Sequence, residues 1–198
     1  MEQTEEIRAP EGGVGGKGAA RVFLPEFPYH PDPLATGSVI WSEVECVCCK
    51  RHRDHIYAGP VFAEETIERR RLCPWCIADG SAAARFGATF SDAGVDAPGD
   101  VPMAVIDTIA RRTPGYLAWQ QARWLFHCGD GAAFLGAVGT KELLDHPDAV
   151  EMLRGEQEGR PAQQIENHLA ALDKDGPPTA YLFRCRSCGA DLAYSDST

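Results

Sequence analysis

The chain has 198 residues, of which 44% are apolar and 24% charged, and 19 Lys and Arg face 29 Asp and Glu, giving a formal net charge of -10. This length and composition predict a folded protein of one domain or two small ones and exclude a low-complexity chain. The negative charge is the wrong sign for a protein that mainly binds a phosphate backbone, so we expect a protein partner, not yet identified, rather than nucleic acid.

The N-terminal part of the sequence indicates where the protein works. Residues 1–21 have few large apolar side chains, so they predict a disordered tail. There is no run of eighteen apolar residues and no basic-then-apolar secretory signal. We therefore expect a cytoplasmic protein without a membrane span, whose eight cysteines stay reduced.

The first half of the chain is predicted to be irregular, with short strands. Four prolines make residues 22–36 an extended segment, and residues 37–48 form a strand that leads into a cysteine turn. A second strand is expected from residue 55, and the Ala-rich residues 77–86 favour a short helix. The Gly and Asp residues at 87–100 are typical of a linker.

The second half is predicted to be mainly helical, with a final hairpin. Apolar spacing and helix stop signals favour helices over residues 100–115, 141–156 and 161–176. Residues 116–128 are expected to begin as helix and end as strand. Residues 179–196 predict a β-hairpin whose turn is a Cys-x-x-Cys-Gly sequence.

The most informative motif is a pair of Cys-x-x-Cys sequences. Cys46 and Cys49 are followed, after 23 intervening residues, by Cys73 and Cys76. Each such turn, or zinc knuckle, presents two sulfur atoms on one side of the backbone, so two knuckles supply the four thiolates of a structural zinc site. A hairpin between the knuckles and a helix after the second resemble a treble-clef zinc finger.

Cys48 and the second pair leave alternatives open. Cys48 adjoins Cys49, but only Cys46 has the correct spacing to it, so Cys48 is interpreted as a small buried side chain or spare thiol rather than a ligand. A Cys-x-x-Cys sequence that begins a helix is also found in redox proteins. The matching pair upstream favours zinc over that redox role.

A second zinc site is a hypothesis with incomplete support. Cys185 and Cys188 form another knuckle, in which Gly189 suits a positive φ, and Cys128 with His127 would complete three cysteines and one histidine. Adjacent strand residues point to opposite faces, so His127 and Cys128 converge only if a turn intervenes. The alternative is a core Cys128 and a tight hairpin with free thiols.

These predictions define an α+β protein with a treble-clef-like four-cysteine zinc module, a helical middle and a C-terminal β-hairpin with a further Cys-x-x-Cys knuckle. We expect residues 22–95 to form the zinc-knuckle module. Residues 96–198 form the helical segment and knuckle hairpin, packed with the module as one compact unit. One zinc ion is expected, and a second depends on the site at Cys128, Cys185 and Cys188.

Two alternative functions compete with a structural role. An incomplete zinc site at Cys128, Cys185 and Cys188, with Asp130 as a base, would suit a metal-dependent hydrolase. Basic clusters at 50–53 and 69–71 would suit a nucleic-acid-binding zinc protein, although residues 43–76 hold six acidic and six basic side chains. Neither alternative is the leading interpretation, and no catalytic or cofactor-binding residues are predicted.

Several sequence strings resemble a known family. They are LPEFPYHPDPLATGSV, CVCC, LCPWCIADGSAAARF, RTPGYLAWQQARWLFHCGDGAAFLG and YLFRCRSCG, which together span residues 22–192. They resemble the CbrC-like family of small, uncharacterised bacterial proteins, some members of which are described as colicin tolerance proteins. The resemblance implies no reaction and no residue role. We therefore expect a zinc-binding structural or adaptor protein rather than an enzyme.

Overall fold

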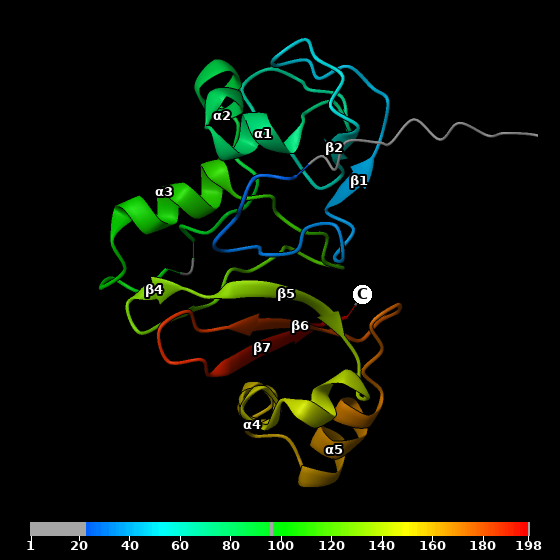
Figure 1. Cartoon of the computed structure of the whole chain (residues 1–198). Helices are drawn as coiled ribbons and strands as arrows, with labels where there is room; N and C mark the ends of the chain where they lie inside the picture. The colour runs from blue at the N-terminus through cyan, green and yellow to red at the C-terminus, as the bar shows by residue number, and fades with distance from the viewer. Residues whose placement is uncertain (1–22, 96, 198) are drawn as a thin grey trace, which may run out of the picture.

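The computed structural model describes residues 23–95 and 97–197, so the tail predicted at 1–21 lies outside it. The described chain mixes helices and sheets in three parts (Figure 1). Short strands and helices lie at one end, a three-stranded sheet occupies the middle, and a helical layer covers the other end of the molecule. None of the helices in the described part of the chain is long and apolar enough to cross a membrane.

The first part contains the predicted strands and helix. Strands β1 (Val39–Trp41) and β2 (His55–Tyr57) pair in antiparallel fashion. Helix α1 (Pro74–Ala78) begins directly after Cys73, with a proline at its first position, where no backbone N–H is needed. The Ala-rich segment forms α2 (Ser81–Phe86), which ends at a left-handed glycine, as many helices do.

The central sheet is antiparallel, in the order β5, β6, β7. Strand β5 (Ala133–Val138) lies beside β6 (Thr179–Arg184), and the predicted C-terminal hairpin is confirmed as β6 and β7 (Asp191–Asp196). A small hairpin of β3 (Phe126–His127) and β4 (Asp130–Gly131) precedes the sheet. Helix α3 (Met103–Arg112) confirms the helix predicted over residues 100–115.

The C-terminal helical layer is inserted between β5 and β6. It consists of the 3-10 helix η1 (Glu142–Asp145), α4 (Pro147–Glu156) and α5 (Ala162–Ala170), with α4 packed on β7. The helical prediction over 141–156 is confirmed by η1 and α4, which form two segments because Pro147 starts a new helix rather than continuing η1. Helix α5 ends at Ala170, earlier than the predicted stop at Gly176.

The predicted helical start of residues 116–128 is wrong. Residues 116–125 form an irregular loop, and only Phe126–His127 is strand. The backbone N–H groups of Trp119 and Arg123 donate to the hydroxyls of Tyr181 and Tyr194. These tertiary hydrogen bonds replace those that a helix would make.

Residues 87–100 differ from a free linker as well. Phe90 and Ala93 are buried, and Thr89 pairs with Phe62 through reciprocal backbone hydrogen bonds of 2.7 and 2.9 Å. Phe90 packs in the apolar core of the first part, and Ala93 packs in the core of the middle part. The segment therefore contributes to both cores.

Candidate metal centres

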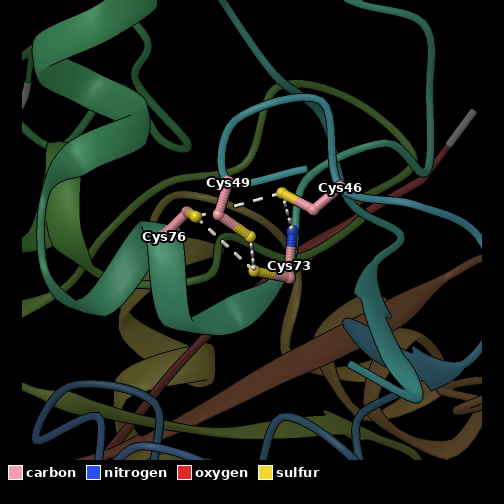
Figure 2. Close-up of side chains that lie close together, drawn as sticks. All are labelled: Cys46, Cys49, Cys73 and Cys76. Carbon is pink, nitrogen blue, oxygen red and sulfur yellow. Dashed lines mark hydrogen bonds between the residues drawn. The ribbon is translucent and has the colours of Figure 1, made fainter. Parts of the chain in front are cut away.

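Four cysteine side chains of the first part face one another (Figure 2). We call Cys46, Cys49, Cys73 and Cys76 site 1. The Sγ atoms are 3.9 Å apart between Cys46 and Cys76, 3.8 Å between Cys49 and Cys73, and 3.6 Å between Cys73 and Cys76. A tetrahedron of thiolates with Zn–S bonds of about 2.3 Å has edges of about 3.8 Å. The site 1 spacing therefore fits a tetrahedral thiophilic ion.

The first knuckle of site 1 is closed by two backbone hydrogen bonds. The N–H of Cys46 donates to the carbonyl of Arg51 (3.0 Å), and the N–H of Lys50 donates to the carbonyl of Cys46 (2.8 Å). Lys50 has a φ of 56°, a left-handed conformation that favours glycine. The turn thus brings the Cys46 and Cys49 sulfurs to one side at the expense of local strain.

The pKa values of the site 1 thiols are shifted by their close contacts with one another. The neighbouring Cys73 and Cys76 thiols lower the pKa of Cys46. The hydrogen bond to the Cys46 sulfur raises the pKa of Cys73 to about 12 and that of Cys76 above its usual range. Closely spaced sulfurs disfavour several thiolates at once, so four thiolates together require a cation.

Burial ties site 1 to the fold. Cys46, Cys73 and Cys76 are buried within an apolar core that includes Ile56 and Ile77. The N–H of Cys73 donates to the Cys46 sulfur at 3.3 Å. Site 1 is thus part of the packed interior of this end of the molecule.

Cys48 lies outside the four-cysteine group. Its Sγ is 3.6 Å from the hydroxyl of Ser81, and its carbonyl accepts a hydrogen bond from Arg85 at 2.7 Å. It is half-buried, in accordance with the spare thiol that the spacing predicts. Because Cys48 lies next to Cys49 in the sequence but outside site 1, Cys48→Ser is a suitable control for substitutions of the site 1 cysteines.

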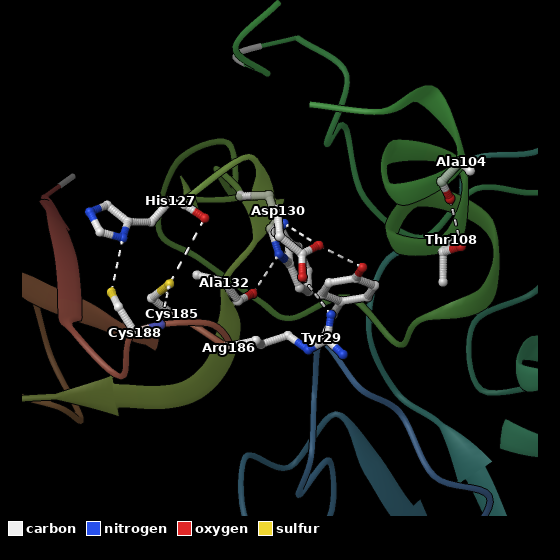
Figure 3. A network of polar contacts seen from close by, with 11 residues as sticks. Tyr29, Ala104, Thr108, His127, Asp130, Ala132, Cys185, Arg186 and Cys188 are labelled. Atoms are coloured by element: carbon white, nitrogen blue, oxygen red, sulfur yellow. Dashed lines mark hydrogen bonds and ion pairs between the residues drawn. The ribbon is translucent and has the colours of Figure 1, made fainter. Parts of the chain in front are cut away.

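A second group lies where the β3–β4 turn meets the β6–β7 turn (Figure 3). We call His127, Cys128, Cys185 and Cys188 site 2. The Nδ1 atom of His127 is 3.3 Å from the Cys128 sulfur and 3.4 Å from the Cys188 sulfur. Tetrahedral zinc with one nitrogen and three sulfur ligands separates nitrogen from sulfur by about 3.6 Å. The ligand atoms all lie within 4.8 Å of one another.

The turn conformation explains how the adjacent His127 and Cys128 converge. Cys128 and Gly129 are the two central residues of the β3–β4 hairpin, and both have positive φ, 53° and 69°. Such two-residue turns require left-handed backbone at both positions, which suits glycine and strains cysteine. The alternative of a core Cys128 is wrong, because its side chain is exposed.

The Cys185 knuckle repeats the hydrogen bonds of the Cys46 knuckle. The N–H of Cys185 donates to the carbonyl of Ala190 (2.8 Å), and the N–H of Gly189 donates to the carbonyl of Cys185 (3.0 Å). Gly189 has the positive φ expected of it, 79°. Burial alone would raise the pKa of the Cys185 thiol. Hydrogen bonds with the Cys188 backbone and His127 outweigh this effect and lower the pKa to about 6.

A polar network beside site 2 connects its two loops (Figure 3). Asp130 accepts a hydrogen bond from the Tyr29 hydroxyl (2.8 Å) and forms an ion pair with Arg186 (2.7 Å). The Arg186 guanidinium also lies over the Tyr29 ring, 4.6 Å from its centroid. Sequence reasoning considered Asp130 only as a base and missed Tyr29 and Arg186, although Arg186 lies between two cysteines of one knuckle.

The basic clusters of the first part are partly occupied by internal contacts. The Arg53 guanidinium lies over the Trp75 ring, 5.0 Å from the centroid, and Arg71 pairs with Glu68 at 2.8 Å. Arg69 and Arg70 are exposed. Lys50 and Arg51 are exposed as well, so most of the predicted basic surface is open to solvent.

Comparison with known proteins finds relatives that match this chain over most of its length. Residues 24–197 match the model of an uncharacterised protein family, UPF0167. A UPF0167 protein of Mycobacterium bovis is 55% identical over 175 residues, covering 87% of this chain and 93% of the relative. A UPF0167 protein of Pseudomonas aeruginosa is 40% identical over 166 residues, covering 84% and 93%. No solved structure matches the chain.

Proposed function

Because the chain belongs to the UPF0167 family, whose description names no activity, we propose from its own residues that it is a zinc-binding structural or adaptor protein. The observation that carries the proposal is the pair of complete four-ligand clusters, site 1 and site 2. The resemblance to the CbrC-like family is compatible with this role and adds no reaction to it.

Zinc is the ion that suits both donor sets. Four thiolates, or three thiolates and one imidazole, are typical ligands of structural zinc, whereas Mg²⁺ and Ca²⁺ prefer oxygen. Four cysteines also bind iron–sulfur clusters, but three sulfur pairs of site 1 are 3.6 to 3.9 Å apart and all four sulfurs lie within 4.8 Å of one another, which suits a single ion. All eight cysteines are unpaired, which supports a reducing, cytoplasmic location.

The coordination of both sites favours a structural role over catalysis. A catalytic zinc ion keeps one position open for water, with three protein ligands. In site 2 the Nδ1 of His127 lies within 3.4 Å of two sulfurs, so it would fill the position that a hydrolase needs. We also propose that residues 22–95 form a treble-clef-like zinc module and that this module packs with residues 96–198 as one unit.

The adaptor role follows from surface and charge. A net charge of -10 disfavours a phosphate backbone as the main partner. Large apolar side chains such as Trp41 and Leu144 are exposed, and protein interfaces commonly bury such groups. We therefore propose a protein partner, and salt-sensitive retention on DNA or RNA at low ionic strength would contradict this choice.

Elemental analysis of protein purified without added metal tests the proposal. We expect two zinc ions per chain in the natural protein and in Cys48→Ser, and one in Cys188→Ser. One zinc ion in the natural protein would remove site 2 from the proposal, and none would refute it altogether. Detection of iron together with an equimolar amount of sulfide would instead identify an iron–sulfur cluster.

A further inference from the structure

The two candidate zinc sites differ sharply in their access to solvent. In site 1, Cys46, Cys73 and Cys76 are 0%, 1% and 3% exposed. In site 2, His127, Cys128 and Cys188 are exposed, and only Cys185 is buried. Cys49 is half-buried. A small oxidant in solution therefore reaches the Cys128 and Cys188 sulfurs of site 2 without any opening of the fold, whereas three of the four site 1 cysteines are shielded.

The loops of site 2 are also held by contacts that need no metal. The Asp130–Arg186 ion pair joins the two loops, and Tyr29 donates to the same carboxylate. Beneath them, Phe134 and Phe183 belong to an apolar core in the middle part of the molecule. Loss of an ion from site 2 would thus leave the loops close together, which keeps the cysteines positioned to react with each other.

We propose that site 2 is an oxidation-sensitive zinc site, in which peroxide converts Cys128 and Cys188 to a disulfide and releases the ion. This inference rests on the proposed occupancy of site 2 by zinc. Cys128 and Cys188 are the pair because both are exposed and their sulfurs both contact His127 Nδ1, at 3.3 and 3.4 Å. Cys185 is buried, and its sulfur accepts the Cys188 N–H.

The chemistry balances with hydrogen peroxide as the two-electron oxidant. The Cys188 thiolate attacks one peroxide oxygen, the O–O bond breaks, and sulfenic acid and hydroxide form. The Cys128 thiolate then attacks the Cys188 sulfur, forming the S–S bond and displacing a second hydroxide. Two protons from solvent convert the hydroxides to water. Two thiolates are oxidised, one peroxide is reduced, and Zn²⁺ leaves because two ligands are lost.

Peroxide titration of the zinc-loaded full-length protein tests the inference. A chromogenic chelator follows zinc release, and mass spectrometry of proteolytic fragments maps disulfides. We expect one of two zinc ions per chain to be released, together with a Cys128–Cys188 disulfide and unchanged circular dichroism. A thiol reductant with added Zn²⁺ should restore two ions per chain.

Matched variants separate the possible failures. Cys48→Ser should behave as the natural protein does, whereas Cys128→Ser should form no Cys128–Cys188 disulfide. Two zinc ions at the start but none released, both released together, or a Cys185–Cys188 disulfide alone would overturn the inference. A starting content of one zinc ion would instead show that the proposed occupancy of site 2 has failed.

Discussion

The carboxylate of Asp130 and the guanidinium of Arg186 form an ion pair of 2.7 Å between the two loops that supply site 2. Each loop contributes two of the four side chains, so this contact fixes the loops relative to each other. Contacts outside the ligand set hold ligands in place for metal binding, and their loss commonly weakens affinity by about 10- to 100-fold.

Arg186→Gln should therefore weaken zinc binding at site 2 by about tenfold, because it breaks the contact between the loops while sparing all four ligands. Competition with a chromogenic chelator measures the affinity. Arg184→Gln is the matched control, since Arg184 pairs with Asp191 within the same hairpin at 2.7 Å and does not join the loops. Equal affinity in the two variants would contradict the role of Arg186.

Cys73→Ser should produce insoluble or unfolded protein. Structural zinc contributes on the order of 10 kcal/mol to the folded state of small zinc domains, and this substitution removes a buried ligand. The soluble fraction after expression and the circular dichroism spectrum measure the effect. Cys48→Ser should stay soluble and folded, and a soluble, fully folded Cys73→Ser protein would refute a structural role for site 1.

A strong chelator at neutral pH should remove zinc in two phases. The exposed ion of site 2 should leave first without loss of helical signal, because its loops keep their polar contacts. The ion of site 1 should leave only as the first part of the molecule unfolds, because three of its four cysteines are buried in the core. Zinc release and circular dichroism recorded on one sample would separate the phases, and simultaneous release would contradict the difference in burial.

Acid should destabilise the protein through His30. Burial lowers the pKa of this imidazole to about 4, and its ring nitrogens lie 2.7 Å from the Pro114 carbonyl and the Thr36 hydroxyl. The unfolded chain, with a pKa near 6.5, binds a proton more readily than the folded chain between these values. The free energy of unfolding should therefore fall by about 3 kcal/mol as pH drops from about 6.5 to about 4.

Denaturant unfolding at several pH values measures this dependence. His30→Gln provides the comparison, because it keeps both metal sites and removes only the titrating ring. The natural protein should lose more stability than the variant across this pH range. Parallel pH profiles for the two proteins would show that His30 does not cause the loss.

The two knuckles predict opposite effects of substitution at equivalent positions. Lys50→Gly should stabilise the protein by up to about 1 kcal/mol, because Lys50 has left-handed backbone, which costs a side-chain-bearing residue about 1–2 kcal/mol. Gly189→Ala should destabilise it by about 1 kcal/mol for the same backbone reason, since no atom lies within 4 Å of the added methyl group. Chemical denaturation measures both changes, and the same sign in both variants would contradict the equivalence.

Local signals made part of the structure predictable from sequence. The Ala-rich α2, the apolar spacing of α3 and the Cys-x-x-Cys-Gly turn each depend on neighbouring residues. The grouping of Cys46 and Cys49 with Cys73 and Cys76 followed from spacing alone, and the structure brings these sulfurs together.

Long-range contacts made the rest unpredictable. Residues 116–125 have helix-forming side chains, but hydrogen bonds to Tyr181 and Tyr194, more than 60 residues away, determine their path. The convergence of His127 and Cys128 depends on the left-handed backbone conformation of Cys128, which cannot be predicted from the residue type. The contact of Tyr29 with Asp130 spans 101 residues and has no sequence signal.

The order of the cysteines along the chain has a consequence for biosynthesis. Site 1 is complete once residue 76 has left the ribosome, whereas site 2 needs Cys188, which follows His127 by 61 residues. The whole helical layer from η1 to α5 is translated between those two ligands. Because N-terminal parts of a chain fold first during synthesis, the first ion can be captured on the nascent chain, and the second enters only after the last hairpin has emerged.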